Sequence, residues 1–203
     1  MEPTGSGSPG SPLRGARGAL ARPPPNSAAL GILSNRGYVR VGIDRETASF
    51  AVRSIHRWWT LMARRAYPRA KSLMITVDGG GSNGPRIALW KWELQRLAEA
   101  TGLKITVCHF PPGASEWNKI EHRLFSYISQ NWRGRPLTSL AVIVSLIAAT
   151  TTSAGLRVRA EIDRRKYPLK VQVPWKDVLS IRLRKHRVHG DWNYTIRPRT
   201  GDR

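Results

Sequence analysis

Cysteine, acidic residues and long apolar runs are all scarce in this sequence. Cys108 is the single cysteine, which excludes an internal disulfide and a metal site built from several thiolates. There is no run of about 18 apolar residues, the length that a membrane-spanning helix needs. The N-terminus also lacks the continuous apolar segment of a signal peptide. We therefore expect a cytoplasmic protein with no membrane partner.

The scarcity of acids is the more informative of these absences. The chain has 34 lysines and arginines against 13 acids in 203 residues, which gives a formal net charge of +21. A protein this basic is expected to bind a polyanion, most simply DNA or RNA. The alternative at this stage is a ribosome-like protein, or one that is merely basic.

Composition divides the chain into three parts. The first thirty residues hold six prolines, five glycines and four serines, and without apolar periodicity they predict a disordered tail over residues 1–34. Residues 35–155 carry the regular patterns of a folded domain. Residues 156–203 are predicted to be a basic C-terminal extension of that domain, because positions 157–203 include 14 lysines and arginines and only five acids.

The middle part alternates between strand and helix patterns. Apolar and polar residues alternate over 37–43, which predicts a strand, and apolar residues then recur at helical spacing from Ala48 to Met62. Further strands are expected at 72–77, 104–108 and 192–196, and further helices at about 85–101, 116–131 and 138–152. This order predicts an α/β domain in which strands 72–77 and 104–108 are adjacent and parallel.

Asp78 is placed for chemistry at the end of the predicted strand 72–77. It is followed directly by a glycine-rich loop at 79–84, where glycines allow the backbone to approach a ligand closely. Open α/β sheets bind their ligands at the carboxyl ends of their strands. Asp78 is therefore a candidate catalytic and metal-binding residue.

Glu121 is the second candidate acid. On the predicted helix 116–131 it falls within the apolar stripe that includes Trp117 and Leu124. An acid on a buried face must be protonated, paired or bound to a metal. A salt bridge to an arginine at the edge of the core is one interpretation, and a Mg²⁺ ligand that faces Asp78 is the other. Asn118, one turn earlier, would orient water or phosphate.

Two further polar residues lie at strand ends and remain ambiguous. Asp44 follows the strand at 37–43 and precedes a helix, so its first interpretation is the N-cap of that helix, and metal binding is the less favoured one. His109 follows the strand at 104–108 and would contact substrate there.

Four contiguous motifs carry a family resemblance. They are ITVDGGGSNG at 75–84, HFPPG at 109–113, WNKIEHRLF at 117–125 and QNWRG at 130–134. These motifs resemble bacterial insertion-sequence transposases, and the nearest group is the Rhodopirellula-type DDE transposases. The resemblance covers about residues 35–199 and implies an RNase H-like fold, in which a mixed sheet is flanked by helices.

The resemblance also implies a site. Members of the family hold two Mg²⁺ or Mn²⁺ ions with an Asp, Asp, Glu triad, whose second and third acids match Asp78 and Glu121. No residue upstream matches the first acid, since Glu2 is the only acid in residues 1–34. We therefore expect an incomplete fold, truncated at its N-terminus, that lacks the first strands and the first catalytic Asp.

Three functions remain open from the sequence. The first is a DDE transposase catalytic fragment for metal-dependent cleavage and transfer of DNA strands, inactive alone, and the second is a DNA-binding transposase remnant without catalysis. The third is an RNase H-like nuclease. Transposon-end and target DNA would be the partners in a nucleoid-associated complex, and a homo-oligomer is one arrangement of that complex that the sequence leaves open. The residues expected to contact DNA are Asn118, Lys119, Arg182, Arg184, Lys185 and Arg187.

Overall fold

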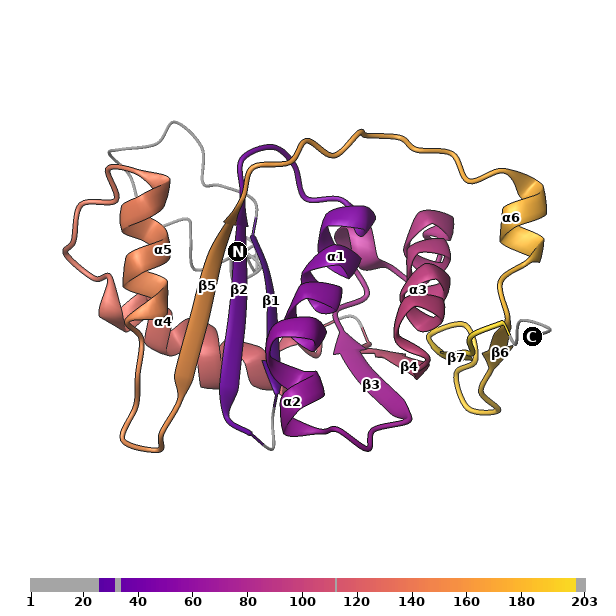
Figure 1. Ribbon diagram of the computed structural model, residues 1–203, viewed down its shortest axis with the longest axis horizontal. Coiled ribbons are helices and arrows are strands. Elements are labelled where there is room, and N and C mark those ends of the chain that lie inside the picture. Colours follow the sequence, from indigo (N-terminus) through magenta and orange to yellow (C-terminus); the bar gives the residue numbers. More distant parts are fainter. Residues whose placement is uncertain (1–25, 32–33, 112, 200–203) are drawn as a thin grey trace, which may run out of the picture.

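The chain folds into a mixed α/β structure with two separate sheets. The computed structural model describes residues 26–31, 34–111 and 113–199. One sheet has the order β1-β2-β5 and the other has the order β3-β4-β7-β6 (Figure 1). The strands are β1 (Asn26–Gly31), β2 (Arg36–Gly42), β3 (Ser72–Val77), β4 (Lys104–His109), β5 (Arg157–Asp163), β6 (Leu183–Lys185) and β7 (Asn193–Ile196).

Each sheet combines parallel and antiparallel pairs. In the first sheet, β1 is antiparallel to β2 and β5 is parallel to it. In the second, β3 and β4 are parallel, and the short hairpin of β6 and β7 joins the antiparallel side of β4. The predicted parallel pairing of strands 72–77 and 104–108 is therefore confirmed, with β4 extending one residue further.

The helices lie on the faces of these sheets. The α-helices are α1 (Ala48–Trp58), α2 (Arg64–Ala66), α3 (Ala88–Thr101), α4 (Ser126–Asn131), α5 (Leu140–Ala148) and α6 (Trp175–Leu179). The tighter or wider helical turns are η2 (Trp59–Ala63), η3 (Gly81–Asn83), η4 (Ser115–Trp117) and η5 (Glu121–Phe125). None of the described helices is long and apolar enough to cross a membrane.

Local sequence explains several of the helix ends. Thr47 caps α1, because its hydroxyl accepts a hydrogen bond from the Phe50 amide at 3.2 Å, and Ser139 caps α5 in the same way. Gly102 ends α3 as predicted, since it adopts a φ of 72° that a side chain disfavours. The helix expected at 116–131 is instead divided into the 3₁₀ turn η4, the π-helical turn η5 and the short α-helix α4.

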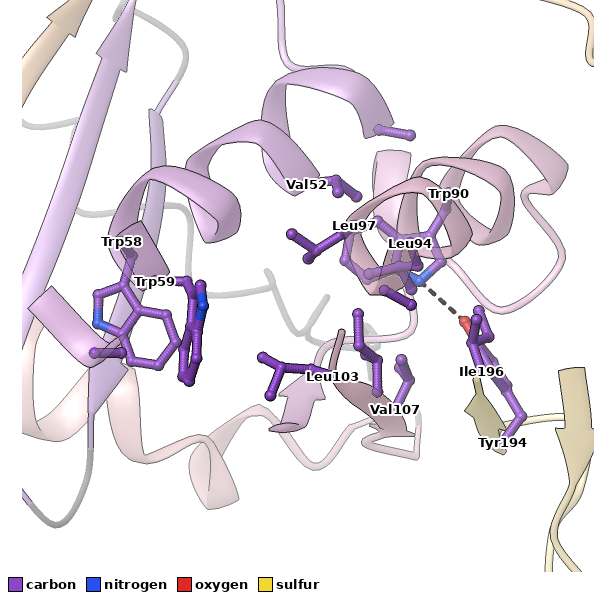
Figure 2. Packing of buried hydrophobic residues seen from close by; sticks show 14 of the residues in the cluster. Val52, Trp58, Trp59, Trp90, Leu94, Leu97, Leu103, Val107, Tyr194 and Ile196 are labelled. Atoms are coloured by element: carbon purple, nitrogen blue, oxygen red, sulfur yellow. Dashed lines mark hydrogen bonds between the residues drawn. The ribbon is translucent and has the colours of Figure 1, made fainter. Parts of the chain in front are cut away.

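Two apolar cores hold the sheets to the helices. In the first core, α1 and α3 pack on one face of the second sheet, where the indole of Trp90 donates a hydrogen bond of 3.0 Å to the Tyr194 hydroxyl (Figure 2). In the second core, η5, α4 and α5 pack on the first sheet through Leu124, Ile128 and Ile143. Tyr38 of β2 belongs to the first core and Val39 to the second, so β2 is covered on both faces.

Three strands correct the sequence analysis, and one of them is β6, which lies among the basic residues at 182–187 where no strand was predicted. Asn26–Gly31 forms β1 although these residues were assigned to the disordered tail, and β5 was not predicted at all. The rest of that tail, residues 1–25 and 32–33, lies outside the described residues apart from Ser34. β5 has arginine and glutamate at alternate positions, a pattern that is typical of an exposed charged segment. Only its pairing with β2 shows that it is a strand.

A buried polar cluster fixes the start of the segment that links β5 to α6. Arg40 of β2 and Asp163 of β5 form an ion pair at 3.1 Å, with side chains 8% and 3% exposed. The hydroxyl of Tyr167 donates to the same carboxylate, and burial, followed by that hydrogen bond, raises the pKa of the hydroxyl. Two guanidinium nitrogens of Arg40 have no partner in the structure, so Asp163 is the main compensation for this buried charge.

This cluster predicts a large effect of one substitution. Asp163→Asn should lower the free energy of unfolding by about 3–5 kcal/mol, because it leaves the Arg40 charge buried and unpaired. Urea unfolding followed by tryptophan fluorescence measures the change. Arg96→Ala is the control, since the Arg96 side chain that pairs with Glu93 on α3 is 62% exposed and its loss should change stability by less than about 1 kcal/mol. Equal effects of the two substitutions would contradict this account.

Candidate metal and nucleic-acid site

Asp78 follows β3 directly and is exposed to solvent. The glycine-rich loop then turns through η3, where Gly81 has a φ of 68°, a conformation that residues with a side chain rarely adopt. His109, at the end of the neighbouring strand β4, has its Nε2 2.9 Å from the Asn83 carbonyl oxygen. The loop is thereby held against the carboxyl ends of the parallel strands, and the carboxylate of Asp78 remains open.

Asn118 connects Asp78 to the helical turn that carries Glu121. Its side-chain amide donates to an Asp78 carboxylate oxygen at 3.3 Å. Its side-chain oxygen accepts from the Ile120 amide at 3.3 Å, and its carbonyl accepts from the Glu121 amide at 3.1 Å. Asn118 is itself only 8% exposed. It is therefore a positioning residue between the two acids.

Glu121 and Asp78 line the same cavity, which has a volume of about 730 Å³. Burial raises the pKa of the Glu121 carboxyl, and the negative charge of Asp78 raises it further, while His122 partly opposes them. Glu121 opens the π-helical turn η5, and such turns occur frequently at functional sites. The two acids that the sequence singled out are thus electrostatically coupled across one cavity.

Glu46 is an acid at this cavity that the sequence analysis missed. It lies between β2 and α1, it lines the same cavity, and burial raises the pKa of its carboxyl. No motif or periodicity in its surroundings distinguishes it. Among the described residues, however, no group of three or more His, Cys, Asp or Glu side chains is close enough to hold one metal ion.

Asp44 does not cap α1, which is a correction to its first interpretation. Thr47 is the cap, and the Asp44 carboxylate instead accepts a hydrogen bond of 2.8 Å from the Tyr167 amide. Asp44 is not among the residues that line the cavity of Asp78 and Glu121. The contact with Tyr167 ties the end of β2 to the segment after β5.

His109 is engaged by the main chain on both sides of its ring. Besides the contact with Asn83, its Nδ1 lies 2.7 Å from the Trp192 carbonyl oxygen, and the residue is only 6% exposed. Its ring also lies beside that of Tyr194, with 5.8 Å between the centroids. Its visible contacts link the loop after Asp78 to β7.

The basic residues expected to contact DNA fall into two places. Lys119 lines the cavity and is exposed. Arg182, Arg184, Lys185 and Arg187 are exposed on and around β6, the strand at the opposite edge of the second sheet from β3. Lys185 forms an ion pair with Asp191 at 2.5 Å, and its charge helps to lower the pKa of Lys91 on α3, after burial.

The donor set at the cavity suits a hard divalent cation. Mg²⁺ in proteins is commonly held by one or two carboxylates, while waters and substrate phosphates supply its other ligands. Asp78 and Glu121 provide two carboxylates, and the exposed Asp78 leaves room for water.

The family comparison gives one match over most of the chain. The model of the family described as Rhodopirellula transposase DDE domain matches residues 25–198. No curated protein and no solved structure matches the chain. The match begins next to β1 and includes every described strand and helix.

The coupling of the two acids predicts a titration shift. Asp78→Asn should lower the pKa of the Glu121 carboxyl, because it removes the neighbouring negative charge that disfavours ionisation of Glu121. A carbon-detected NMR titration of the glutamate carboxyls measures it. Asp44→Asn removes a carboxylate outside the cavity and should leave Glu121 unchanged. An unchanged pKa of Glu121 in Asp78→Asn would show that the two acids are not coupled.

Proposed function

We propose, for a chain that belongs to the Rhodopirellula transposase DDE-domain family, that Asp78 and Glu121 bind divalent metal ions for the cleavage and transfer of DNA strands. The observation that carries this proposal is the single cavity in which the two acids lie, joined through Asn118. Mg²⁺ or Mn²⁺ is the expected ion, because both prefer oxygen ligands.

Each residue of the cavity would have a separate part in this chemistry. Bound metal ions would polarise the phosphodiester and activate the attacking oxygen. Asp78 and Glu121 would hold the ions, and Asn118 would keep Asp78 oriented through its amide hydrogen bond. Lys119 would contact a phosphate at the mouth of the cavity, where it is exposed.

The basic edge of the second sheet would bind a part of the DNA that lies at a distance from the phosphate that reacts in the cavity. Arg184 and Arg187 are exposed there, and Arg86 near the start of α3 interacts electrostatically with Asp191 of the same hairpin. Cations therefore extend from β6 toward the loop that follows Asp78. Phosphate contacts of this kind position DNA without reading its sequence.

Two carboxylates rather than three leave much of the metal coordination to water. We therefore expect cleavage by this chain alone to be very weak, since a loosely held ion does not align the attacking and leaving oxygens. The alternative function is a DNA-binding transposase remnant without catalysis, which the basic edge would support equally. An RNase H-like nuclease would share the metal site but would not join strands. A homo-oligomeric transposition complex on nucleoid DNA is the expected setting for the first function.

Metal binding tests the role of the two acids directly. Mn²⁺ should bind the chain weakly, and Asp78→Asn or Glu121→Gln should each weaken binding about tenfold or more, as loss of one of two charged ligands implies. Isothermal titration calorimetry measures the affinity, and Asp44→Asn is the matched control. Mn²⁺ binding that survives Asp78→Asn but is lost in Asp44→Asn would place the metal elsewhere.

A strand-cleavage assay separates catalysis from binding alone. Nicking of supercoiled DNA with Mg²⁺ or Mn²⁺ should be barely detectable for the chain, and it should become robust when an Asp-bearing strand is fused ahead of β1. Asp78→Ala and Glu121→Ala should each abolish that gain. Robust nicking by the unfused chain that depends on Asp44 would contradict the assignment.

DNA affinity should depend strongly on salt. The logarithm of the affinity should fall linearly with the logarithm of salt concentration, with a slope of about −0.9 for each phosphate neutralised. Replacing both Arg184 and Arg187 by Gln should flatten that slope by about two such units if both contact phosphates. Fluorescence anisotropy at several salt concentrations measures it. Arg64 and Arg65 on α2 are also exposed, and an equal change on replacing that pair would mean that contact is spread over the whole surface.

A further inference from the structure

One face of the second sheet has no apolar core packed against it among the described residues. Leu73 and Ile75 of β3 and Ile105 of β4 point to the first core, on the side of α1 and α3. In β7 the residue on that side is Tyr194, which reaches Trp90 of α3 (Figure 2). Side chains of a strand alternate between the two faces of its sheet, and no residue of β3, β4, β6 or β7 belongs to the second core. The uncovered side is named here the open face.

The open face takes alternate positions from all four strands and is mostly polar. Met74, at the middle of its row on β3, is 68% exposed. Lys104 at the start of β4 and Arg184 of β6 are also exposed. The side chains that characterise the face are Met74, Thr76, Lys104, Thr106, Arg184 and Thr195.

Hydrogen bonds connect the polar side chains in the part of the open face that β7 occupies. The hydroxyl of Thr195 lies 3.0 Å from that of Thr106 and 2.8 Å from Nε2 of His186. Arg184 stands opposite Thr195 in the pairing of β6 with β7, so its side chain lies on the same face. A row of polar groups therefore crosses the sheet from β4 to β6.

The charge of the open face is positive. None of the described strands β3, β4, β6 and β7 contains an acidic residue. Lys104 and Arg184 are exposed on the face, and Lys119 is exposed where the face meets the cavity. Asp191 of the β6–β7 hairpin pairs with Lys185, which points to the covered side. Lysine, arginine and threonine side chains are among the groups that contact DNA phosphates, so the face is complementary to a polyanion.

Other occupants suit the open face less well. The core of a protein interface is enriched in aromatic and apolar side chains, and Met74 is the exposed large apolar residue of this face. A second copy of the chain, with the same net charge of +21, would bring like charges together. Single strands are held by aromatic side chains that stack on bases, and Tyr194 of these strands lies on the covered side. A duplex that is held through its phosphates fits best.

The open face leads directly to the two acids. Met74 and Thr76 belong to the face and also line the cavity of Asp78 and Glu121. β3 has six residues, which extend over about 17 Å at about 3.3 Å for each step. That length corresponds to about five base steps of a duplex at about 3.4 Å each. A duplex along the face would therefore reach the cavity without a bend.

We propose that the open face binds the phosphate backbone of a DNA duplex whose reacting phosphate enters the cavity of Asp78 and Glu121, with Lys104 and Arg184 as phosphate contacts. The inference rests on the proposed function and adds to it the path of the DNA and a role for Lys104. Because the contacts are made to phosphates, binding on this face is independent of base sequence.

Cys108 provides a probe of this location. It is the single cysteine of the chain, it lies on the same face as Thr106 and it is partly exposed. A photo-crosslinker attached to its thiol should link to a short duplex of arbitrary sequence, with a yield that falls as salt rises. The control carries the same reagent at Ala100→Cys in a Cys108→Ser chain, since Ala100 is exposed on α3, on the covered side. It should link to the duplex far less.

Two neighbouring lysines on opposite faces give the second arm. Lys104→Gln should make the slope of log affinity against log salt less steep by about 0.9, because one phosphate contact is lost. Lys71→Gln removes the same charge from the residue whose carbonyl accepts the Lys104 amide. Lys71 points to the side of Leu73, away from the open face, so the slope should not change. Fluorescence anisotropy with the same duplex measures both.

The outcomes separate this inference from the proposed function. Equal cross-linking from Cys108 and from Ala100→Cys would overturn the assignment of the DNA path, and so would a cross-link to a second copy of the chain instead of DNA. An unchanged slope in Lys104→Gln would do the same. The duplex would still bind in these cases, and the proposed function would stand. A chain that binds no duplex even at low salt would contradict both.

Discussion

Packing of α1 against both sheets is the interaction on which the arrangement of this protein depends. No described strand of one sheet pairs with a described strand of the other, so packing of side chains is the main interaction that holds the sheets together. One core surrounds α1, and it includes Tyr38 of the first sheet together with Ile105 and Val107 of the second. Ala29 of the first sheet packs against this core. Replacement of Trp58 of α1 or of Trp59 of the adjoining η2 by alanine would cost about 3–5 kcal/mol each, because both are buried. The hydrogen bond from Asn118 to the exposed Asp78 carboxylate contributes less free energy to this arrangement. Apolar packing is therefore the dominant interaction between the two sheets.

The candidate site lies across the same junction. Asp78 belongs to the second sheet through β3, whereas the turn with Glu121 packs on the first sheet through Leu124. The hydrogen bond from Asn118 to Asp78 joins the two halves at 3.3 Å. A change in the spacing of the sheets would therefore alter the distance between the acids before it altered either acid's own surroundings.

Acidic and basic side chains occupy different parts of this protein. Acids gather at the cavity, where Glu46, Asp78 and Glu121 are found with one lysine, Lys119. The remainder of the surface is dominated by cations, in keeping with the net charge of +21. The positive net charge would attract a polyanion to the protein as a whole, whereas the carboxylates at the cavity would repel a phosphate locally. A divalent cation between the acids would reverse that local repulsion and let a phosphate enter.

Local sequence alone determined the parts of this protein that depend on neighbouring residues. The strand that precedes Asp78, the left-handed stop at Gly102 and the parallel pairing of β3 with β4 could all be predicted, because apolar periodicity, turn chemistry and the connection through one helix are visible in nearby residues. Asp78 and Glu121 were found as candidates for the same reason.

Tertiary structure decided the rest. The polar strand β5 forms only because β2 offers it an edge, and Asp44 contacts Tyr167, which lies 123 positions away in the sequence. The separation of the sheets and the entry of Glu46 into the cavity likewise come from packing between distant segments, and no local pattern encodes those contacts.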